Sequence, residues 1–218
     1  MKQSVIIVAG GKGSRMGSET PKQFLPLKGE PILFHTIRSF QLALPEAEIV
    51  LVLPQAEMAR WQVMAFDTPF QSIKTVAGGA QRFDSVKAGL ELVEEGIVGI
   101  HDAVRPLVSQ TCIQNVFKLA AEKGSAIPVV ELKDSLRELS GAQSQAKNRA
   151  DFCLVQTPQC FEVTKLKEAY QQSYQANFTD DASVFEAAGN TIKLVAGNTE
   201  NIKITTPTDL VVAEALMV

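Results

Sequence analysis

The sequence predicts a doubly wound α/β fold with a mostly parallel sheet. Short runs rich in β-branched residues alternate along the 218 residues with segments whose apolar residues recur at helical spacing. Most of the short runs are apolar on both faces, as strands of a parallel sheet covered by helices require. The composition, 45% hydrophobic and 21% charged, is that of an ordinary globular domain and excludes a disordered chain.

The predicted strands are short runs of β-formers separated by helical or turn-forming segments. In chain order they cover residues 4–9, 48–53, 73–77, 97–100, 126–130, 152–156 and 191–196.

The predicted helices are recognised by one-sided apolar stripes. The stripes consist of Leu33, Ile37 and Phe40 after Pro31, then Val86, Leu90 and Val93, then Ile113, Val116 and Ala120, then Leu166, Tyr170 and Tyr174. A last helix begins near residue 206, where Thr206 is a cap, Pro207 suits the first turn and Asp209 replaces the capping-box glutamate.

Residues 131–150 do not fit the alternation, because the stretch is polar and has only Leu132, Leu136 and Leu139 as large apolar residues. These leucines suit a short amphipathic helix, and a mobile loop is a second interpretation. The third is a hairpin arm that projects from the sheet, with strands near 132–139 and 145–149. A two-stranded hairpin is marginal in water, so such an arm would need a partner surface, which suggests an oligomer.

Charge and hydropathy exclude several classes of protein. A net charge of −3 argues against a nucleic-acid binder with a diffuse basic surface, so an anionic ligand needs a local cluster of Lys and Arg. Apolar runs such as 5–9 and 49–53 are far shorter than the ~20 residues of a membrane-spanning helix, and the chain opens with no signal segment. We therefore expect a cytoplasmic protein without a membrane partner.

The three cysteines lack the spacing of a metal site, and only two histidines are available to join them. Cys112, Cys153 and Cys160 are therefore predicted to be core thiols, and no metal site is predicted.

The first strand runs directly into a glycine-rich loop, AGGKGSRMG, at residues 9–17. It is not a Walker A loop, since Gly13 follows Lys12, and not a dinucleotide fingerprint, since Met16 stands where a small residue is needed. Four glycines in eight residues let backbone N–H groups approach an anion closely. With Arg15 and Lys22 nearby, the loop is predicted to cradle phosphate.

The segment AGGKGSRMGSETPKQFLPLKGEPILFHT resembles the signature of nucleotidylyltransferases, and within them of the cytidylyltransferases that make 4-diphosphocytidyl-2-C-methylerythritol in the non-mevalonate isoprenoid pathway. Further matching pieces follow in the family's order: GGAQR at 78–82, HDAVRP at 101–106, QTPQ at 156–159, TDDAS at 179–183 and NIKIT at 201–205. The resemblance implies a nucleotidyltransferase (Rossmann-like) type of fold in one domain, 1–218, with 131–150 as a projecting dimerisation arm.

The implied reaction is the transfer of CMP from CTP to 2-C-methyl-D-erythritol 4-phosphate, with release of pyrophosphate. A phosphate monoester has a second pKa of about 6, so the nucleophile is already anionic and no general base is required. The difficulty is the repulsion between two anions. By the resemblance, Arg15 and Lys22 supply the positive charge that overcomes this repulsion and are the expected catalytic residues, and Mg²⁺, carried mainly by the CTP phosphates, is the expected cofactor.

The resemblance also implies which residues bind the two substrates. For the nucleotide they are Ala9, Gly10, Gly11, Lys12, Gly13, Gly79, Ala80 and Ser85; for the sugar-alcohol phosphate they are Asp102, Arg105, Arg149, Thr179 and Lys203. Ala80 departs from the family, which often has an acidic residue there, so only its backbone is expected to bind.

Several of these residues have a second interpretation. Asp102 is expected to bind substrate hydroxyls, and Arg105 has the alternative role of only holding Asp102. His101 is expected to be a packed histidine without a role. Thr179, an expected phosphate contact, also suits a helix cap. Lys203, in a largely apolar strand, is expected to point inward and grip the acceptor phosphate.

The arm is implied to cross a two-fold axis in a homodimer, so that Arg149 reaches the acceptor phosphate in the neighbouring active site. An arm folded over its own subunit is the alternative. Two other functions stay open: a ribitol-5-phosphate cytidylyltransferase, whose glycine loop and HDAVRP and NIKIT segments are shared, and a non-catalytic nucleotide-binding module.

Overall fold

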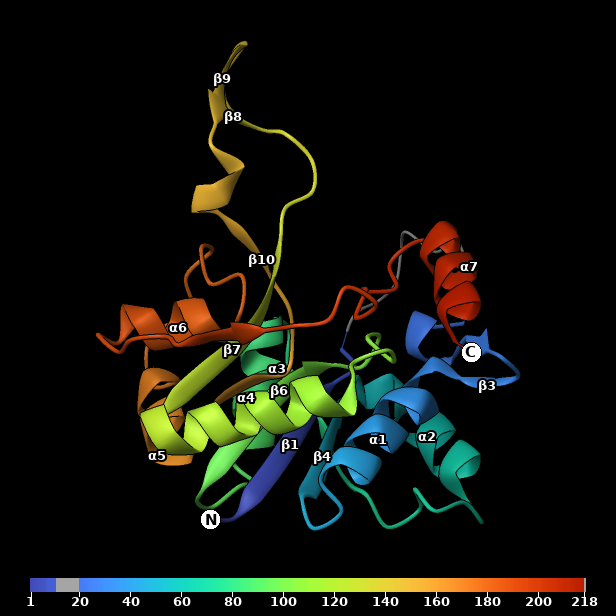
Figure 1. Cartoon of the computed structure of the whole chain (residues 1–218). Coiled ribbons are helices and arrows are strands. Elements are labelled where there is room, and N and C mark those ends of the chain that lie inside the picture. Colours follow the sequence, from blue (N-terminus) through green and yellow to red (C-terminus); the bar gives the residue numbers. More distant parts are fainter. Residues whose placement is uncertain (11–19, 218) are drawn as a thin grey trace.

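The computed structural model describes residues 1–10 and 20–217. One sheet forms its centre (Figure 1). The strands of this sheet are β1 (Gln3–Val8), β4 (Glu48–Leu53), β5 (Lys74–Ala77), β6 (Ile97–Asp102), β7 (Ser125–Glu131), β10 (Cys153–Val155), β11 (Gln159–Glu162) and β12 (Leu194–Ala196). Their order is β10-β7-β11-β6-β1-β4-β5, and β12 pairs with β7.

The sheet is parallel at its centre and mixed toward one edge. β1 pairs in parallel with β4 and β6, β4 with β5, and β12 with β7. β11 is antiparallel to β6 and β7, and β10 is antiparallel to β7. All seven predicted strands form, whereas β11 was not predicted. Its four residues are too few to show a pattern, and both ends of QCFE are polar.

Helices cover both faces of the sheet, which confirms the doubly wound prediction. α1 (Ile32–Ala43), α2 (Met58–Ala65) and α4 (Gln110–Lys123) pack on one face, and α3 (Arg82–Leu90), α5 (Val163–Ala169) and α6 (Asp181–Ala187) pack on the other. Within β1, Val5 and Ile7 join the first apolar layer while Ile6 and Val8 join the second, because successive strand side chains point to opposite faces.

Short elements complete the chain before and after this sandwich. η2 (Lys22–Phe24) precedes the small hairpin of β2 (Pro26–Leu27) and β3 (Glu30–Pro31), and η3 (Gln55–Glu57) precedes α2. α7 (Pro207–Leu216) ends the chain, and Thr206 caps it as predicted: the backbone N–H of Asp209 donates to Thr206 Oγ1 at 3.3 Å, and Asp209 Oδ2 accepts from the Thr206 N–H at 2.8 Å. α5 ends earlier than the predicted stripe, so Tyr170 caps the helix and Tyr174 lies beyond it.

The polar stretch forms a hairpin arm, as the third interpretation predicted. β8 (Leu136–Ser140) and β9 (Gln143–Lys147) pair only with each other, and the arm stands clear of the sheet in Figure 1. Gly141 makes the turn with a φ of +58°, a conformation that glycine adopts without strain. η4 (Arg149–Asp151) connects the arm to β10.

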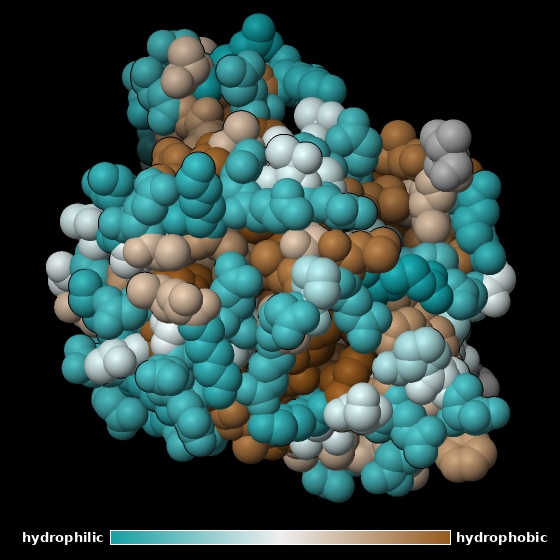
Figure 2. Space-filling model, turned by 60° about the horizontal axis from the view of Figure 1, so that its bottom comes forward, coloured by the Kyte–Doolittle hydropathy of each residue, from teal (hydrophilic) through white to brown (hydrophobic). Residues whose placement is uncertain are grey.

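The cysteine prediction is correct for two residues and wrong for the third. Cys112 and Cys160 are buried, whereas Cys153 is exposed: it lies on β10, an edge strand of the described sheet whose three residues are all exposed. The face in Figure 2 is mostly hydrophilic, with hydrophobic residues visible chiefly in its hollows. None of the described helices is long and apolar enough to cross a membrane. The cytoplasmic location stays a prediction.

Candidate active site

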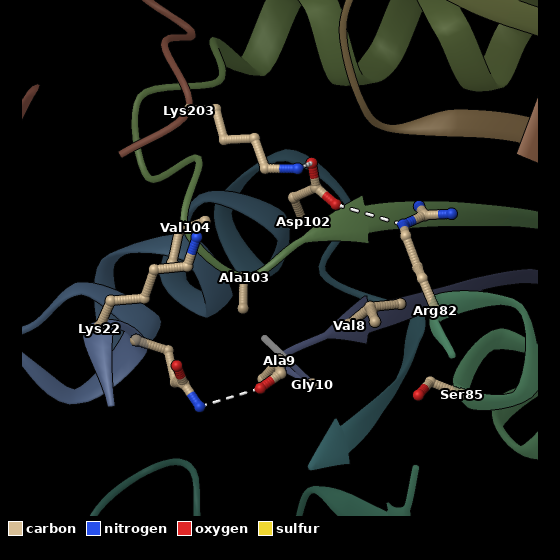
Figure 3. A pocket seen from close by; sticks show the side chains of 11 residues that line it. Val8, Ala9, Gly10, Lys22, Arg82, Ser85, Asp102, Ala103, Val104 and Lys203 are labelled. Carbon is tan, nitrogen blue, oxygen red and sulfur yellow. Dashed lines mark hydrogen bonds and ion pairs between the residues drawn. The ribbon is translucent and has the colours of Figure 1, made fainter. Parts of the chain in front are cut away.

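A cleft with two adjoining lobes opens where the parallel strands β1 and β6 end, the edge at which doubly wound sheets bind ligands. The first lobe has a cavity volume of about 190 Å³. Its lining includes Ala9, Gly10, Lys22, Ser85, Asp102 and Lys203 (Figure 3). The second lobe shares Arg82, Asp102 and Lys203 with the first and adds Arg105, Thr157 and Thr179.

Asp102, the last residue of β6, lies at the junction of the lobes between three cations. Lys203 Nζ is 3.0 Å from its Oδ2 and Arg105 Nε is 3.4 Å from the same oxygen, while Arg82 Nε is 3.6 Å from Oδ1. Burial raises the pKa of this carboxyl, but the charges of Arg82, Lys203 and Arg105 outweigh burial and hold the pKa well below its usual range. Asp102 is therefore ionised at neutral pH, and the Arg105 contact fits the holding role predicted for that residue.

Arg82 is the site residue that the sequence analysis missed. It begins α3, and its two terminal nitrogens donate to Asp181 at 2.9 and 2.7 Å. The only sequence signal was its place in the matching piece GGAQR, and nothing in that piece points to Asp102 or Asp181.

His101 is packed in the core, as predicted. Its Nε2 lies 3.1 Å from the carbonyl oxygen of Arg105, which only accepts, so we assign the ring proton to Nε2. Nδ1 then accepts from the Thr157 hydroxyl at 3.0 Å, and that hydroxyl accepts from the backbone N–H of Asp102. Burial lowers the pKa of His101 to about 4, so the ring is neutral and orients the end of β6.

Lys203 lines both lobes, but the structural premise of its prediction is wrong. Residues 201–205 form no strand, and the Lys203 side chain is 42% exposed. The segment is held instead by single contacts: the Asn201 side chain donates to the Thr157 carbonyl at 2.9 Å, and the backbone N–H of Ile204 donates to the Val104 carbonyl at 2.9 Å. The ion pair with Asp102, rather than burial, accounts for the position of the lysine.

Part of the predicted phosphate loop lies outside the described residues, namely Gly11, Lys12, Gly13 and Arg15. Its two ends are described. Ala9 and Gly10 follow β1, and Gln23 of η2 donates to the Ala9 carbonyl at 2.9 Å, which fixes η2 and Lys22 beside the first lobe.

The glycine pair at 78–79 packs tightly against the start of α3. A Cβ on Gly78 would lie 2.6 Å from Ser85 Oγ, and one on Gly79 would lie 2.3 Å from Asp84 Cβ, so neither position accepts a side chain without movement. This approach places Ser85 in the first lobe. Gly79 and Ala80 are exposed and do not line either lobe, so their predicted contact with the nucleotide stays a prediction.

Thr179 and Asp180 both line the second lobe. Asp180 also caps α6, accepting from the Ser183 N–H at 2.9 Å, while Thr179 lies before the cap. Arg149 is not brought into this cleft. It lies at the base of the arm, is exposed, and donates to the backbone carbonyl of Lys133.

Three comparisons identify the family of the chain. The family model of 2-C-methyl-D-erythritol 4-phosphate cytidylyltransferase (IspD) matches residues 3–218. A relative of that name from Bacteroides thetaiotaomicron is 50% identical, with all of both chains covered. The crystal structure of the Thermus thermophilus enzyme of that name is 32% identical, with a TM-score of 0.79 over 99% of this chain and 98% of that one. The chain therefore belongs to the 2-C-methyl-D-erythritol 4-phosphate cytidylyltransferase family.

Proposed function

We propose that this chain transfers CMP from CTP to 2-C-methyl-D-erythritol 4-phosphate and releases pyrophosphate. The observation that carries the proposal is a two-lobed cleft at the end of β1 and β6, with an ionised Asp102 and three cations where the lobes meet. Ribitol 5-phosphate is not favoured as acceptor, since relatives at 46–50% identity over 98–100% of their lengths have the methylerythritol name. A non-catalytic module would be expected to lack Arg15 or Lys22, and both are present.

The first lobe is proposed to hold CTP. Ala9, Gly10 and Ser85 shape the part next to β1 and α3, and the glycine-rich loop with Lys12 and Arg15 continues from Gly10. Lys22 lines the same lobe and supplies positive charge. Such charge stabilises the five-coordinate α-phosphorus, on which negative charge accumulates in the transition state.

The second lobe is proposed to hold the acceptor. Asp102 accepts hydrogen bonds from its hydroxyls, and Lys203 and Thr179 bind its phosphate. A phosphate oxygen then forms the new bond to the α-phosphorus as the bond to the bridging oxygen breaks, and pyrophosphate leaves. No proton must be removed from a phosphate dianion, so the absence of a base from the proposed residues is consistent with this reaction.

Mg²⁺ is proposed to enter with the triphosphate. Among the described residues no three of His, Cys, Asp or Glu lie together as a metal site, and the one carboxylate lining the first lobe, Asp102, is already engaged by three cations. Phosphate oxygens and water are the ligands that Mg²⁺ prefers. The ion would supply further charge neutralisation, and this chain needs no dedicated carboxylates for it.

The decisive assay combines the purified protein with CTP, Mg²⁺ and either methylerythritol phosphate or ribitol 5-phosphate, and measures pyrophosphate release. Release with the first acceptor at a kcat/KM well above that with the second supports the proposal. A preference for ribitol 5-phosphate would assign the alternative acceptor, and equal rates with both would contradict the proposed preference for methylerythritol phosphate. Background release with both would refute the enzymatic reaction.

Lys203→Ala is expected to raise the KM for the acceptor roughly tenfold or more, because a charged hydrogen bond to the acceptor phosphate is worth about 1.5–3 kcal/mol. Affinity for CTP should change much less. Isothermal titration with CTP alone separates the two substrates. A collapse of CTP affinity would assign Lys203 to the nucleotide.

The arm is proposed to complete the acceptor site of a second subunit in a homodimer. Support comes from its position: Arg149 is exposed and lies outside the cleft of its own chain, and the arm pairs only with itself. Apolar side chains where the arm returns to the sheet are also exposed: Phe152, which precedes β10, at 47%, and Leu154 and Val155 of β10 at 53% and 41%. A guanidinium on the arm can bind two phosphate oxygens of a neighbouring site.

Mixing Arg149→Ala protomers with Lys22→Ala protomers is expected to restore activity. In a mixed dimer one cleft combines an intact Lys22 with an intact Arg149 from the partner, so random mixing should give about a quarter of wild-type activity. Pyrophosphate release is measured before and after mixing, with native mass spectrometry to confirm mixed dimers. Mixed dimers without recovery would mean that Arg149 serves its own chain.

A further inference from the structure

Behind the cleft lies a buried carboxylate that is not part of the lining but binds a lining residue, Arg82. Asp181 is 0% exposed and is absent from both lobes, yet it carries the strongest contacts of Arg82. The two side chains form a bidentate pair with distances of 2.9 and 2.7 Å, and the Tyr170 hydroxyl donates to Asp181 Oδ1 at 2.7 Å. Tyr170 is itself 1% exposed. Asp181 is thus fully engaged inside the protein.

The bidentate pair fixes how Arg82 faces the cleft. Both terminal nitrogens bind Asp181, so only Nε remains directed at Asp102, 3.6 Å from Oδ1. Figure 3 shows this edge of the guanidinium turned toward Asp102 from the side opposite Lys22. Without Asp181, the planar fork of Arg82 would be free to bind both oxygens of Asp102, which is the geometry that arginine prefers with a carboxylate.

Stability alone is a weak reason for such a pair. The cost of removing two charges from water often matches their attraction, and apolar residues can replace buried ion pairs without loss of stability. The neighbouring contacts of α6 are mostly apolar: Val184 and Phe185 belong to the same buried layer as Tyr170. Asp181 differs from these residues because it holds the charged side chain of Arg82 at the wall of the cleft.

We infer that Asp181 is a positioning residue for the acceptor: by binding both terminal nitrogens of Arg82, it keeps Asp102 available for the acceptor hydroxyls. Asp181 contacts neither substrate in this scheme and acts through Arg82. The inference rests on the proposed role of Asp102 in acceptor binding. It predicts a selective effect, in which the acceptor is bound more weakly while CTP is bound as before.

The substitution Asp181→Asn tests this inference, since the amide keeps the shape of the carboxylate side chain and removes its negative charge. The KM for the acceptor is expected to rise about tenfold, with the KM for CTP changing less than about twofold. Arg82→Lys should produce the same selective loss, because an ammonium cannot be held in the bidentate pair with Asp181 and is free to turn its charge to Asp102, and it serves as the second variant if Asp181→Asn fails to fold. Tyr170→Phe keeps both charges and should have the smaller effect.

Val184→Ala is the matched control, because it loosens the same helix without touching the ion pair. It should lower the unfolding temperature and leave both KM values unchanged. A double variant tests whether Asp181 acts through Asp102. When Asp102→Asn is already present, adding Asp181→Asn should change the acceptor KM by less than about twofold.

Three outcomes would overturn the inference: acceptor KM unchanged in Asp181→Asn and Arg82→Lys, equal losses for both substrates, or an undiminished effect in the Asp102→Asn background. A wild-type protein that releases no pyrophosphate with either acceptor would instead refute the proposed function. The two failures are therefore distinguishable.

Discussion

Lys22→Ala is expected to lower kcat by about 10²–10³-fold while the fold stays intact. Lys22 lines the first lobe from η2, and its charge is proposed to stabilise the transition state rather than the bound substrates. A preorganised electrostatic contact of this kind is worth roughly 3–4 kcal/mol. Arg15→Ala should have an effect of the same order. Steady-state pyrophosphate release at saturating CTP and acceptor measures it.

The control is Lys118→Ala, which removes an exposed lysine from α4, away from the cleft. It should keep wild-type kcat and wild-type thermal unfolding. A loss of only two- or threefold in Lys22→Ala, or a loss matched by Lys118→Ala, would mean that Lys22 is not part of the catalytic machinery.

Asp102→Asn is expected to lower both kcat/KM for the acceptor and the free energy of unfolding. The variant leaves Arg82, Arg105 and Lys203 facing a neutral amide, and breaking a largely buried ion pair costs about 3 kcal/mol. It also removes the acceptor for the substrate hydroxyls, so kcat/KM for the sugar phosphate should fall about a hundredfold. Urea unfolding and steady-state kinetics measure the two losses separately.

The stability loss should depend on pH with a definite sign. The pKa of Asp102 is lower in the folded protein than its ordinary value of 3.8, so its stabilising charge is fully present above that value. The stabilisation is lost as the pH falls below about 3.8 toward the lower folded pKa. The difference between wild type and Asp102→Asn should therefore be constant from pH 7 to 5 and shrink below 4.

Asp67→Asn is the matched control for Asp102→Asn, since Asp67 is exposed and its left-handed backbone, with a φ of +57°, suits asparagine. It should change neither the free energy of unfolding nor the kinetics. An Asp102→Asn protein as stable as wild type at pH 7, or one with an unchanged acceptor kcat/KM, would contradict the role assigned to Asp102.

The alternating layout and most of its elements were predictable from local patterns. The strand at 48–53 has the predicted bounds, and the cap at Thr206 forms as its motif predicts, because both depend on neighbouring residues. β11 was missed, since four residues show no periodicity and its antiparallel insertion between β6 and β7 is a long-range pairing. The exposure of Cys153 was missed as well, because no local pattern shows that β10 lies at the edge of the described sheet.

The family and the residue types of the site could be predicted from the sequence alone, because phosphate chemistry demands a glycine-rich loop and local cations, and their motifs are contiguous. The sequence did not predict which charges meet. Arg82 and Asp181 are separated by 99 residues, and Lys203 is held near Asp102 by contacts of its segment, among them those of Asn201 with Thr157 and of Ile204 with Val104. Such contacts depend on how distant segments of the chain pack together, and no local sequence pattern predicts them. The position of Asp102 between three cations, and of Asp181 behind one of them, follows from the packing of the whole chain.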